Sequence, residues 1–190
     1  MKSLKGTKTA DNLAKAFAGE SQARSRYTFY SRAADKEGLK QIASVFLDIA
    51  ENERAHAKIF FDFLVEGLGK SNVKVDGDYP VGFGNTEENL LYAAEGEKME
   101  WGTVYPKFAE DAKTEGFLEV EAAFRKIIEI ETSHEKRYLG FLNKMKSKSV
   151  FKSDTSVNWK CRNCGYIFEG TDAPAVCPTC KHPQGYFELL

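Results

Sequence analysis

Apolar residues recur every three or four positions along two long stretches in the first part of the chain, which is the spacing of the buried stripe on an amphipathic α-helix. The pattern predicts one helix over about residues 9–37, ended by Gly38, and a second over about residues 39–66, ended by Gly67. Glycine is a common helix stop because it adopts left-handed backbone angles without strain.

The following residues repeat this arrangement after a glycine-rich connection from Gly67 to Gly84. Asn85 and Glu88 form a capping-box pattern, which predicts the start of a third helix that extends to about residue 115. A fourth helix follows Gly116 and ends among the lysines near residue 144. Four such helices predict a mostly α protein built on a four-helix bundle.

Two Glu-x-x-His motifs interrupt the apolar stripes of the second and fourth helices. Glu53 and His56 form the first motif, and Glu131 and His134 form the second. Residues three apart in a helix share one face, so each motif directs a carboxylate and an imidazole towards the same point. Apolar residues flank both motifs on the stripe, which places these polar side chains inside the predicted bundle.

An internal duplication relates the two halves of the helical region. The Glu-x-x-His motifs lie 78 positions apart, as do Tyr27 and Tyr105. Glu20 and Glu97 lie 77 positions apart, so the third helix holds one extra residue between its glutamate and its tyrosine. We predict a local π-helical widening at this place.

Glu20 and Glu97 also lie on the inward faces of their helices. A buried ion without a partner costs on the order of several kcal/mol, and no lysine or arginine lies on these stripes at the same level, so a bound metal is the simplest source of positive charge. Glutamates from two helices with a Glu-x-x-His from each of the other two are similar to the ligands of ferritin-like di-iron and di-manganese proteins. Mixed carboxylate and imidazole ligands favour iron or manganese over calcium or structural zinc.

Three further residues lie near this predicted centre. Glu100 stands three residues after Glu97 on the same helical face and adds a candidate carboxylate ligand. Tyr27 and Tyr105 face inward, where each either packs in the core or donates a hydrogen bond to a metal-bound carboxylate. Ala23 occupies the place in the first helix that corresponds to Glu100, so the predicted site is asymmetric.

The cysteines all lie near the C-terminus, in two Cys-x-x-Cys pairs that predict a four-thiolate metal site rather than disulfides. They are Cys161, Cys164, Cys177 and Cys180. A structural zinc ribbon and a mononuclear iron centre both fit this spacing. Nearby aromatic side chains favour iron, because they would exclude water and help to set a redox potential. These residues are Trp159, Tyr166, Phe168, Tyr186 and Phe187.

The net charge and the lack of long apolar runs limit the kinds of partner that this chain is expected to have. The formal net charge is −1, which gives no electrostatic case for nucleic acid or an anionic membrane. No window approaches the ~18 apolar residues of a membrane span, and no signal peptide is evident. We expect a soluble cytoplasmic protein with a helical domain over residues 1–146, a polar linker over 147–157 and a metal-binding domain over 158–190.

Taken together, these motifs resemble the rubrerythrin family over almost the whole chain. The similarity rests on residues 18–24, both Glu-x-x-His motifs, residues 96–100 and the rubredoxin-like tail from Trp159 to Leu190. It implies a ferritin-like four-helix bundle that binds two irons, followed by a small rubredoxin-like β/loop domain that binds one iron through the four cysteines. The implied activity is reduction of hydrogen peroxide to water in oxidative-stress defence.

The resemblance also implies which side chains act as catalytic metal ligands. These are Glu20, Glu53, His56, Glu97, Glu100, Glu131 and His134. Glu53 and Glu131 would bridge the two irons. One iron would exchange Glu100 for His56 when it is reduced, while the other would keep its own histidine.

The implied partners follow from the same resemblance. The cysteine-bound iron would pass electrons to the di-iron site and would receive them from a rubredoxin or a separate NAD(P)H-dependent reductase, since the chain has no glycine-rich nucleotide-binding motif. The family forms homodimers in which the tail of one subunit lies near the di-iron site of the other. Two alternatives to the peroxidase function remain open. One is a ferroxidase or iron-handling protein, and the other is a zinc-stabilised interaction module. Lys181 departs from free-standing rubredoxins, which often have glycine after the second cysteine pair.

Overall fold

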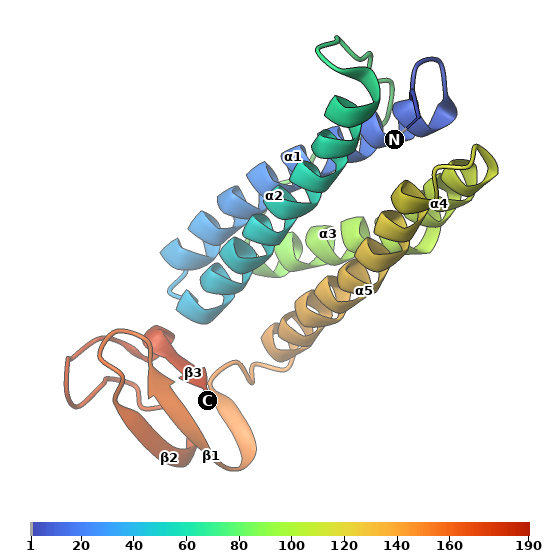
Figure 1. Ribbon diagram of the computed structural model, residues 1–190. Helices are drawn as coiled ribbons and strands as arrows, with labels where there is room; N and C mark the ends of the chain where they lie inside the picture. The colour runs from blue at the N-terminus through green and yellow to red at the C-terminus, as the bar shows by residue number, and fades with distance from the viewer. Residues whose placement is uncertain (1) are drawn as a thin grey trace.

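The computed structural model describes residues 2–190 and consists of a four-helix bundle followed by a small β domain (Figure 1). The mostly α fold predicted from the apolar periodicity is confirmed. Across the described residues 2–190, no helix combines the length and the apolar character that a membrane span requires.

Helices α1 (Lys8–Lys36) and α2 (Lys40–Leu68) pack side by side as an antiparallel pair (Figure 1). Thr7 caps α1 by accepting a hydrogen bond from the backbone N–H of Ala10 at 3.1 Å. Gly38 has a φ of +78° between the two helices, which explains why glycine stands there.

The third long helix has three parts, α3 (Thr86–Met99), a π-helical turn η1 (Glu100–Val104) and α4 (Tyr105–Thr114). The predicted capping box is present between Asn85 and Glu88. The π-helical turn lies between Glu97 and Tyr105, so the widening predicted from the extra residue is confirmed. Its effect is to keep both Glu97 and Tyr105 facing the bundle interior, where both are buried.

Helix α5 (Leu118–Lys146) completes the bundle and ends with the same backbone motif as α1 and α4. In each case two N–H groups beyond the helix bond back to its last turn, as in a Schellman motif. The left-handed residue in this motif is Gly38 after α1 and Gly116 after α4, but it is Lys148 after α5, with a φ of +54°.

Crossed contacts join the two halves of the bundle. The carboxylate of Glu115, just after α4, accepts bonds from the backbone N–H groups of Lys8 and Thr9 at 3.0 and 2.8 Å and from the Thr9 hydroxyl at 2.6 Å, at the start of α1. The carboxylate of Glu37, just after α1, accepts a 3.0 Å bond from the N–H of Thr86, at the start of α3. Each half therefore caps a helix of the other half.

Two apolar clusters fill the bundle, one on each side of the buried glutamates and histidines. Tyr30 and Phe46 are fully buried in the cluster near the α1–α2 turn. Phe60 and Phe124 stack with ring centroids 4.9 Å apart in the other cluster. Because apolar layers enclose the polar layer from both ends, its side chains lie in a low-dielectric environment.

The β domain contains a three-stranded antiparallel sheet in the order β2-β1-β3, formed by β1 (Lys152–Cys161), β2 (Ile167–Asp172) and β3 (Phe187–Leu189). A 3-10 turn, η2 (Gln184–Tyr186), precedes β3. Trp159 and Phe187 are fully buried and form the core of this domain together with two of the cysteines.

The β domain lies beside the end of the bundle where α1 turns into α2 (Figure 1). Gly185 approaches Gly38 so closely that a Cβ atom on Gly185 would lie 1.8 Å from the Gly38 carbonyl oxygen. The Lys40 ammonium lies 5.2 Å from the centre of the Tyr186 ring, within cation–π distance. The β domain can therefore pack against the bundle in this way only because residue 185 is a glycine, which has no side chain.

Candidate metal centres

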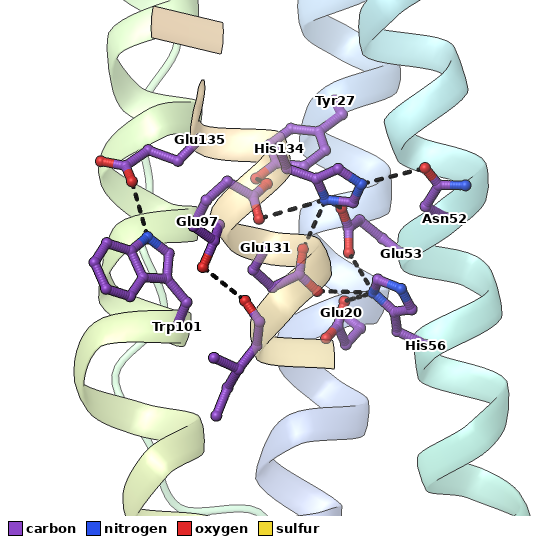
Figure 2. A network of polar contacts seen from close by, with 12 residues as sticks. Glu20, Tyr27, Asn52, Glu53, His56, Glu97, Trp101, Glu131, His134 and Glu135 are labelled. Carbon is purple, nitrogen blue, oxygen red and sulfur yellow. Dashed lines mark hydrogen bonds and ion pairs between the residues drawn. The ribbon is translucent and has the colours of Figure 1, made fainter. Parts of the chain in front are cut away.

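The buried polar layer brings together Glu and His side chains from all four long helices (Figure 2). They are Glu20 from α1, Glu53 and His56 from α2, Glu97 from α3, and Glu131 and His134 from α5. Each is at most 5% exposed. All six side chains face the interior of the bundle, as the apolar stripes predicted.

One group of ligand atoms surrounds His56. Its Nδ1 lies 2.8 Å from Glu131, 3.2 Å from Glu53 and 3.6 Å from Glu20, measured to the carboxylate oxygens. One atom from each of these four residues lies within 4.8 Å of the others. A single small cation would therefore be within reach of all four side chains.

A second group surrounds His134 in the same way. Its Nδ1 lies 2.6 Å from Glu131, 3.2 Å from Glu53 and 3.7 Å from Glu97. Glu53 and Glu131 use different oxygens for the two groups, so each carboxylate spans both. The arrangement is that of two cation positions joined by two carboxylates.

The unpaired atoms of this layer test whether a metal pair fits. Buried polar atoms are normally hydrogen-bonded, yet five carboxylate oxygens and one ring nitrogen here make no hydrogen bond to any described residue between 2 and 190. They are Glu20 Oε2, Glu53 Oε1, Glu97 Oε2, both Glu131 oxygens and His134 Nδ1. All six belong to the two groups, and hard oxygen donors with imidazole nitrogen suit iron.

Electrostatics lead to the same conclusion. Burial raises the pKa of Glu20 and Glu97 well above the ordinary value, and the Glu53 carboxylate raises both further. Burial would also raise the pKa of Glu53, but the adjacent imidazoles of His134 and His56 outweigh it and hold that pKa at about 2. Burial would lower the pKa of His134, but Glu131 and Glu53 raise it to about 12. The carboxylates therefore require positive charge, which protonated imidazoles or metal ions can supply.

Glu100 lies beside this layer rather than within it. It is the first residue of the π-helical turn and is half-buried. Its Oε1 lies 3.8 Å from the place that a Cβ atom on Gly19 would occupy. Burial and the charges of Glu131 and Glu53 raise its pKa well above the ordinary value, so it is electrostatically coupled to the layer.

The two inward tyrosines each donate to a carboxylate of the other half. The Tyr27 hydroxyl donates to Glu97 Oε1 and the Tyr105 hydroxyl to Glu20 Oε1, both at 2.5 Å. Burial, with the neighbouring carboxylates, raises the pKa of both phenols well above the ordinary value, so both retain their protons. Each ring also packs in an apolar cluster, so both tyrosines combine core packing with a hydrogen bond to a glutamate.

Two residues near the layer were not identified from the sequence. Asn52 directs Oδ1 to Nε2 of His134 at 3.2 Å (Figure 2). The Tyr138 hydroxyl is buried without a hydrogen bond to any of residues 2–190, and its pKa is raised by burial and by Glu97. Tyr138 lies on the apolar stripe and resembles a packing residue, whereas Asn52 precedes Glu53 and lies off the stripe.

The four cysteines form a second candidate centre in the β domain. Their sulfur atoms lie within 4.8 Å of one another, and Cys161 to Cys180 and Cys164 to Cys177 are each 3.7 Å apart. None forms a disulfide. The backbone N–H of His182 lowers the pKa of Cys180 to about 5, which favours the thiolate that a metal requires.

Equivalent turns present the two cysteine pairs. The N–H of Gly165 bonds to the Cys161 carbonyl at 2.8 Å, and the N–H of Lys181 bonds to the Cys177 carbonyl at 3.0 Å. Gly165 has a φ of +79° and Lys181 a φ of +63°, so lysine here adopts the conformation for which glycine is suited. The backbone geometry of the second pair is retained although glycine is absent.

Both centres lie in segments of the chain that match models of known protein families. The family model described as rubrerythrin matches residues 11–142, and the model described as the rubrerythrin rubredoxin-like domain matches residues 159–188. Rubrerythrin-1 of Clostridium acetobutylicum is 59% identical over 191 aligned positions, covering 100% of this chain and 98% of the relative. Rubrerythrin of Clostridium perfringens is 53% identical with the same coverage.

Solved structures show the same fold. A structure of nigerythrin in a mixed-valent state matches with a TM-score of 0.65 and 28% identity, covering 100% of this chain and 92% of that chain. A bacterioferritin of Rhodobacter capsulatus matches with a TM-score of 0.66 and 20% identity, covering 75% of this chain and 88% of that chain. The bacterioferritin shows the likeness of the fold alone.

Proposed function

This chain belongs to the rubrerythrin family, and from that premise we propose that it is a peroxidase that reduces hydrogen peroxide to water in oxidative-stress defence. Its cofactors are two irons at the Glu/His layer and one iron at the four cysteines. The observation that carries the proposal is that Glu53 and Glu131 each span both groups of ligand atoms, which supports a two-metal centre.

The proposed ligand assignment follows the two groups. Glu53 and Glu131 would bridge the irons. Glu20 and His56 would serve one position, with Glu100 as the alternative to His56, and Glu97 and His134 would serve the other. This assignment is supported by the distances within each group and by the place of Glu100 just outside them.

Two irons held here would supply the two electrons that, together with two protons, convert one molecule of hydrogen peroxide into two molecules of water. The side chains around the centre manage the protons. The phenols of Tyr27 and Tyr105 keep their own protons and donate them in hydrogen bonds to Glu97 Oε1 and Glu20 Oε1, respectively, at the edge of the reaction site. Apolar layers above and below exclude bulk water from the rest of the site.

A small cavity of about 80 Å³ beside Glu100 offers an approach for the substrate. It lies between α1 and the π-helical turn, and its lining includes Gly19, Arg26 and Tyr79. Tyr79 belongs to the connection between α2 and α3, and its hydroxyl bonds to the Lys15 carbonyl at 3.2 Å. A cavity of this size suits hydrogen peroxide better than a bulky organic hydroperoxide.

The iron of the β domain would return electrons to the di-iron centre, and a rubredoxin or an NAD(P)H-dependent reductase would supply them. The β domain contacts α2 near Lys40, whereas Glu53 lies thirteen residues further along that helix, a rise of roughly 20 Å. A homodimer that places the tail of one chain near the centre of the other would shorten this path. The four free cysteines suit the reducing cytoplasm, where we place the protein.

The test is a rapid-mixing experiment on the fully reduced, iron-loaded protein. We expect hydrogen peroxide to reoxidise it at least ten times faster than dioxygen at the same concentration. The four-cysteine iron is followed separately by its red ferric colour, which bleaches on reduction. A reaction with dioxygen as fast as that with peroxide would instead favour a ferroxidase.

A further inference from the structure

Asn52 gives the ring of His134 a hydrogen bond that the ring of His56 lacks. The distance from Asn52 Oδ1 to His134 Nε2 is 3.2 Å, whereas none of residues 2–190 forms a hydrogen bond with Nε2 of His56. The two rings are otherwise placed alike, since both direct Nδ1 towards Glu53 and Glu131. They also lie nearly parallel, with centroids 6.0 Å apart.

The internal duplication explains this difference. Asn52 directly precedes Glu53, and the residue 78 positions later, Ile130, directly precedes Glu131. The two halves of the bundle are related by pseudo-symmetry. Ile130 therefore occupies the position relative to His56 that Asn52 occupies relative to His134. Isoleucine has no acceptor to offer. Ile130 is 39% exposed, so burial in the core does not account for an apolar residue at this position.

The hydrogen bond also selects the protonation form of His134 that can bind a metal. A metal held by Nδ1 requires a lone pair there, which leaves the proton on Nε2. Asn52 presents its amide oxygen to this N–H, so it favours that tautomer and that ring orientation together. Acceptors in this position commonly determine how firmly a histidine ligand is held.

We infer that Asn52 is a positioning residue that holds His134 at the metal centre, and that Ile130 leaves His56 without an equivalent restraint. The asymmetry rests on the contacts of the two rings alone. Its consequence rests on the proposed function: of the two histidines, His56 is the one that can leave its metal in exchange for Glu100.

Exchange of imidazole protons with water tests the inference in the full-length protein loaded with zinc at all three metal positions. Zinc is diamagnetic, and the chain has only three histidines, so the side-chain signals can be assigned by NMR. We expect the Nε2 proton of His134 to exchange at least ten times more slowly than that of His56. Equal exchange at the two rings in the unaltered protein would overturn the inference.

Three variants separate positioning from a general structural effect. Asn52→Leu should remove the slow exchange of His134, while Asn52→Asp, which keeps an acceptor, should retain it. Ile130→Asn should slow the exchange at His56. If Asn52→Leu leaves the exchange at His134 unchanged, or if Asn52→Asp behaves like Asn52→Leu, the positioning role is wrong.

Zinc affinity provides a second measurement. Loss of an outer acceptor typically weakens metal binding by about 10- to 100-fold, so Asn52→Leu should weaken one of the two bundle positions by about this factor and leave the four-cysteine position unchanged. Equal weakening at every position would indicate a structural effect and contradict the inference. Neither measurement depends on peroxide turnover, so failure of the proposed peroxidase activity would remain distinguishable.

Discussion

The hydroxyl of Tyr27 donates a hydrogen bond of 2.5 Å to Oε1 of Glu97, and this bond joins α1 to α3 inside the polar layer. Tyr105 and Glu20 form the matching bond with the roles of the two halves exchanged. In each pair, the tyrosine of one half fixes one oxygen of the other half's glutamate and leaves the second oxygen facing the metal position.

Replacing this phenol should slow the peroxide reaction without removing the metals. Tyr27→Phe keeps the ring but removes the proton donor to Glu97, and we expect peroxide to reoxidise the reduced protein roughly 10- to 100-fold more slowly. Tyr30→Phe is the matched control, because the Tyr30 hydroxyl bonds to the Gly82 carbonyl, away from the centre. Equal rates for the unaltered protein and Tyr27→Phe would show that the phenol has no part in the reaction.

Glu100 should matter for one oxidation state more than for the other. Glu100→Ala removes the proposed alternative to His56, so we expect the oxidised di-iron centre to lose affinity for one iron while the reduced centre is retained. Iron content and the visible spectrum after oxidation measure this, and the red colour of the four-cysteine iron should be unchanged. Glu95→Ala is the control, since Glu95 is exposed on the same helix. Unchanged turnover in Glu100→Ala would rule out ligand exchange.

Tyr79 should limit the size of the substrate. Tyr79→Ala enlarges the cavity beside Glu100, so we expect the rate with tert-butyl hydroperoxide to rise at least tenfold relative to the rate with hydrogen peroxide. Tyr79→Phe keeps the ring and should retain the discrimination of the unaltered protein. A constant ratio of the two rates across all three proteins would place the approach of substrate elsewhere.

Lys148 should be a site where glycine stabilises the bundle. A left-handed conformation costs a non-glycine residue roughly 1–2 kcal/mol, while the extra freedom of glycine in the unfolded chain offsets part of that gain. We expect Lys148→Gly to raise the free energy of unfolding by about 1 kcal/mol, measured by urea denaturation. Gly116→Ala tests the same motif in reverse and should destabilise the bundle. A loss of stability in Lys148→Gly would contradict this account.

The cap provided by Glu115 should make stability depend on pH. Burial opposes ionisation of this carboxyl, but hydrogen bonds from Thr9 and Lys8 outweigh it and lower its pKa in the folded protein. A lowered folded-state pKa gives stability that is present above the ordinary value of 4.5 and is lost as pH falls through the lowered value. Glu115→Gln should therefore destabilise the protein at pH 7, by about 1 kcal/mol, and have little effect near pH 3.

Urea midpoints at both pH values measure this difference. Glu37→Gln is the comparison, because Glu37 accepts one backbone bond where Glu115 accepts three bonds. The Glu37 variant should lose less stability at neutral pH. A destabilisation of Glu115→Gln that is the same at pH 7 and pH 3 would show that ionisation is not the source of the cap.

The helices and most of the metal layer could be predicted from the sequence because both depend on periodicity. A carboxylate such as Glu53 within an apolar stripe must face the interior wherever the helix packs. The π-helical turn could be predicted because duplicated halves must remain in phase at Glu97 and at Tyr105, although one residue separates their offsets. Both features follow from the geometry of a single helix and from the likeness of the two halves.

The remaining features depend on how separate elements meet. Asn52 lies outside the stripe of α2, and its role exists only because α5 brings His134 beside it. Gly185 lies outside the periodic segments of the sequence, and its close approach to Gly38 follows from how the β domain packs against the bundle. Lys148 and Lys181 take left-handed conformations that their residue type disfavours, so local preference alone would have misplaced them.

The crossed caps of Glu37 and Glu115 have a consequence for the origin of the fold. A single helical hairpin would carry at its turn a carboxylate whose partner N–H groups belong to another hairpin, and it would hold only half of the ligand atoms. An ancestor of one hairpin would therefore have assembled as a pair, with identical halves around a symmetric metal centre. Gene fusion would then have freed the halves to diverge. A paired ancestor of identical chains could not have had three of the present differences between the halves. These are the one-residue insertion in the third helix, the presence of Glu100 in only one half, and the contrast between Asn52 and Ile130.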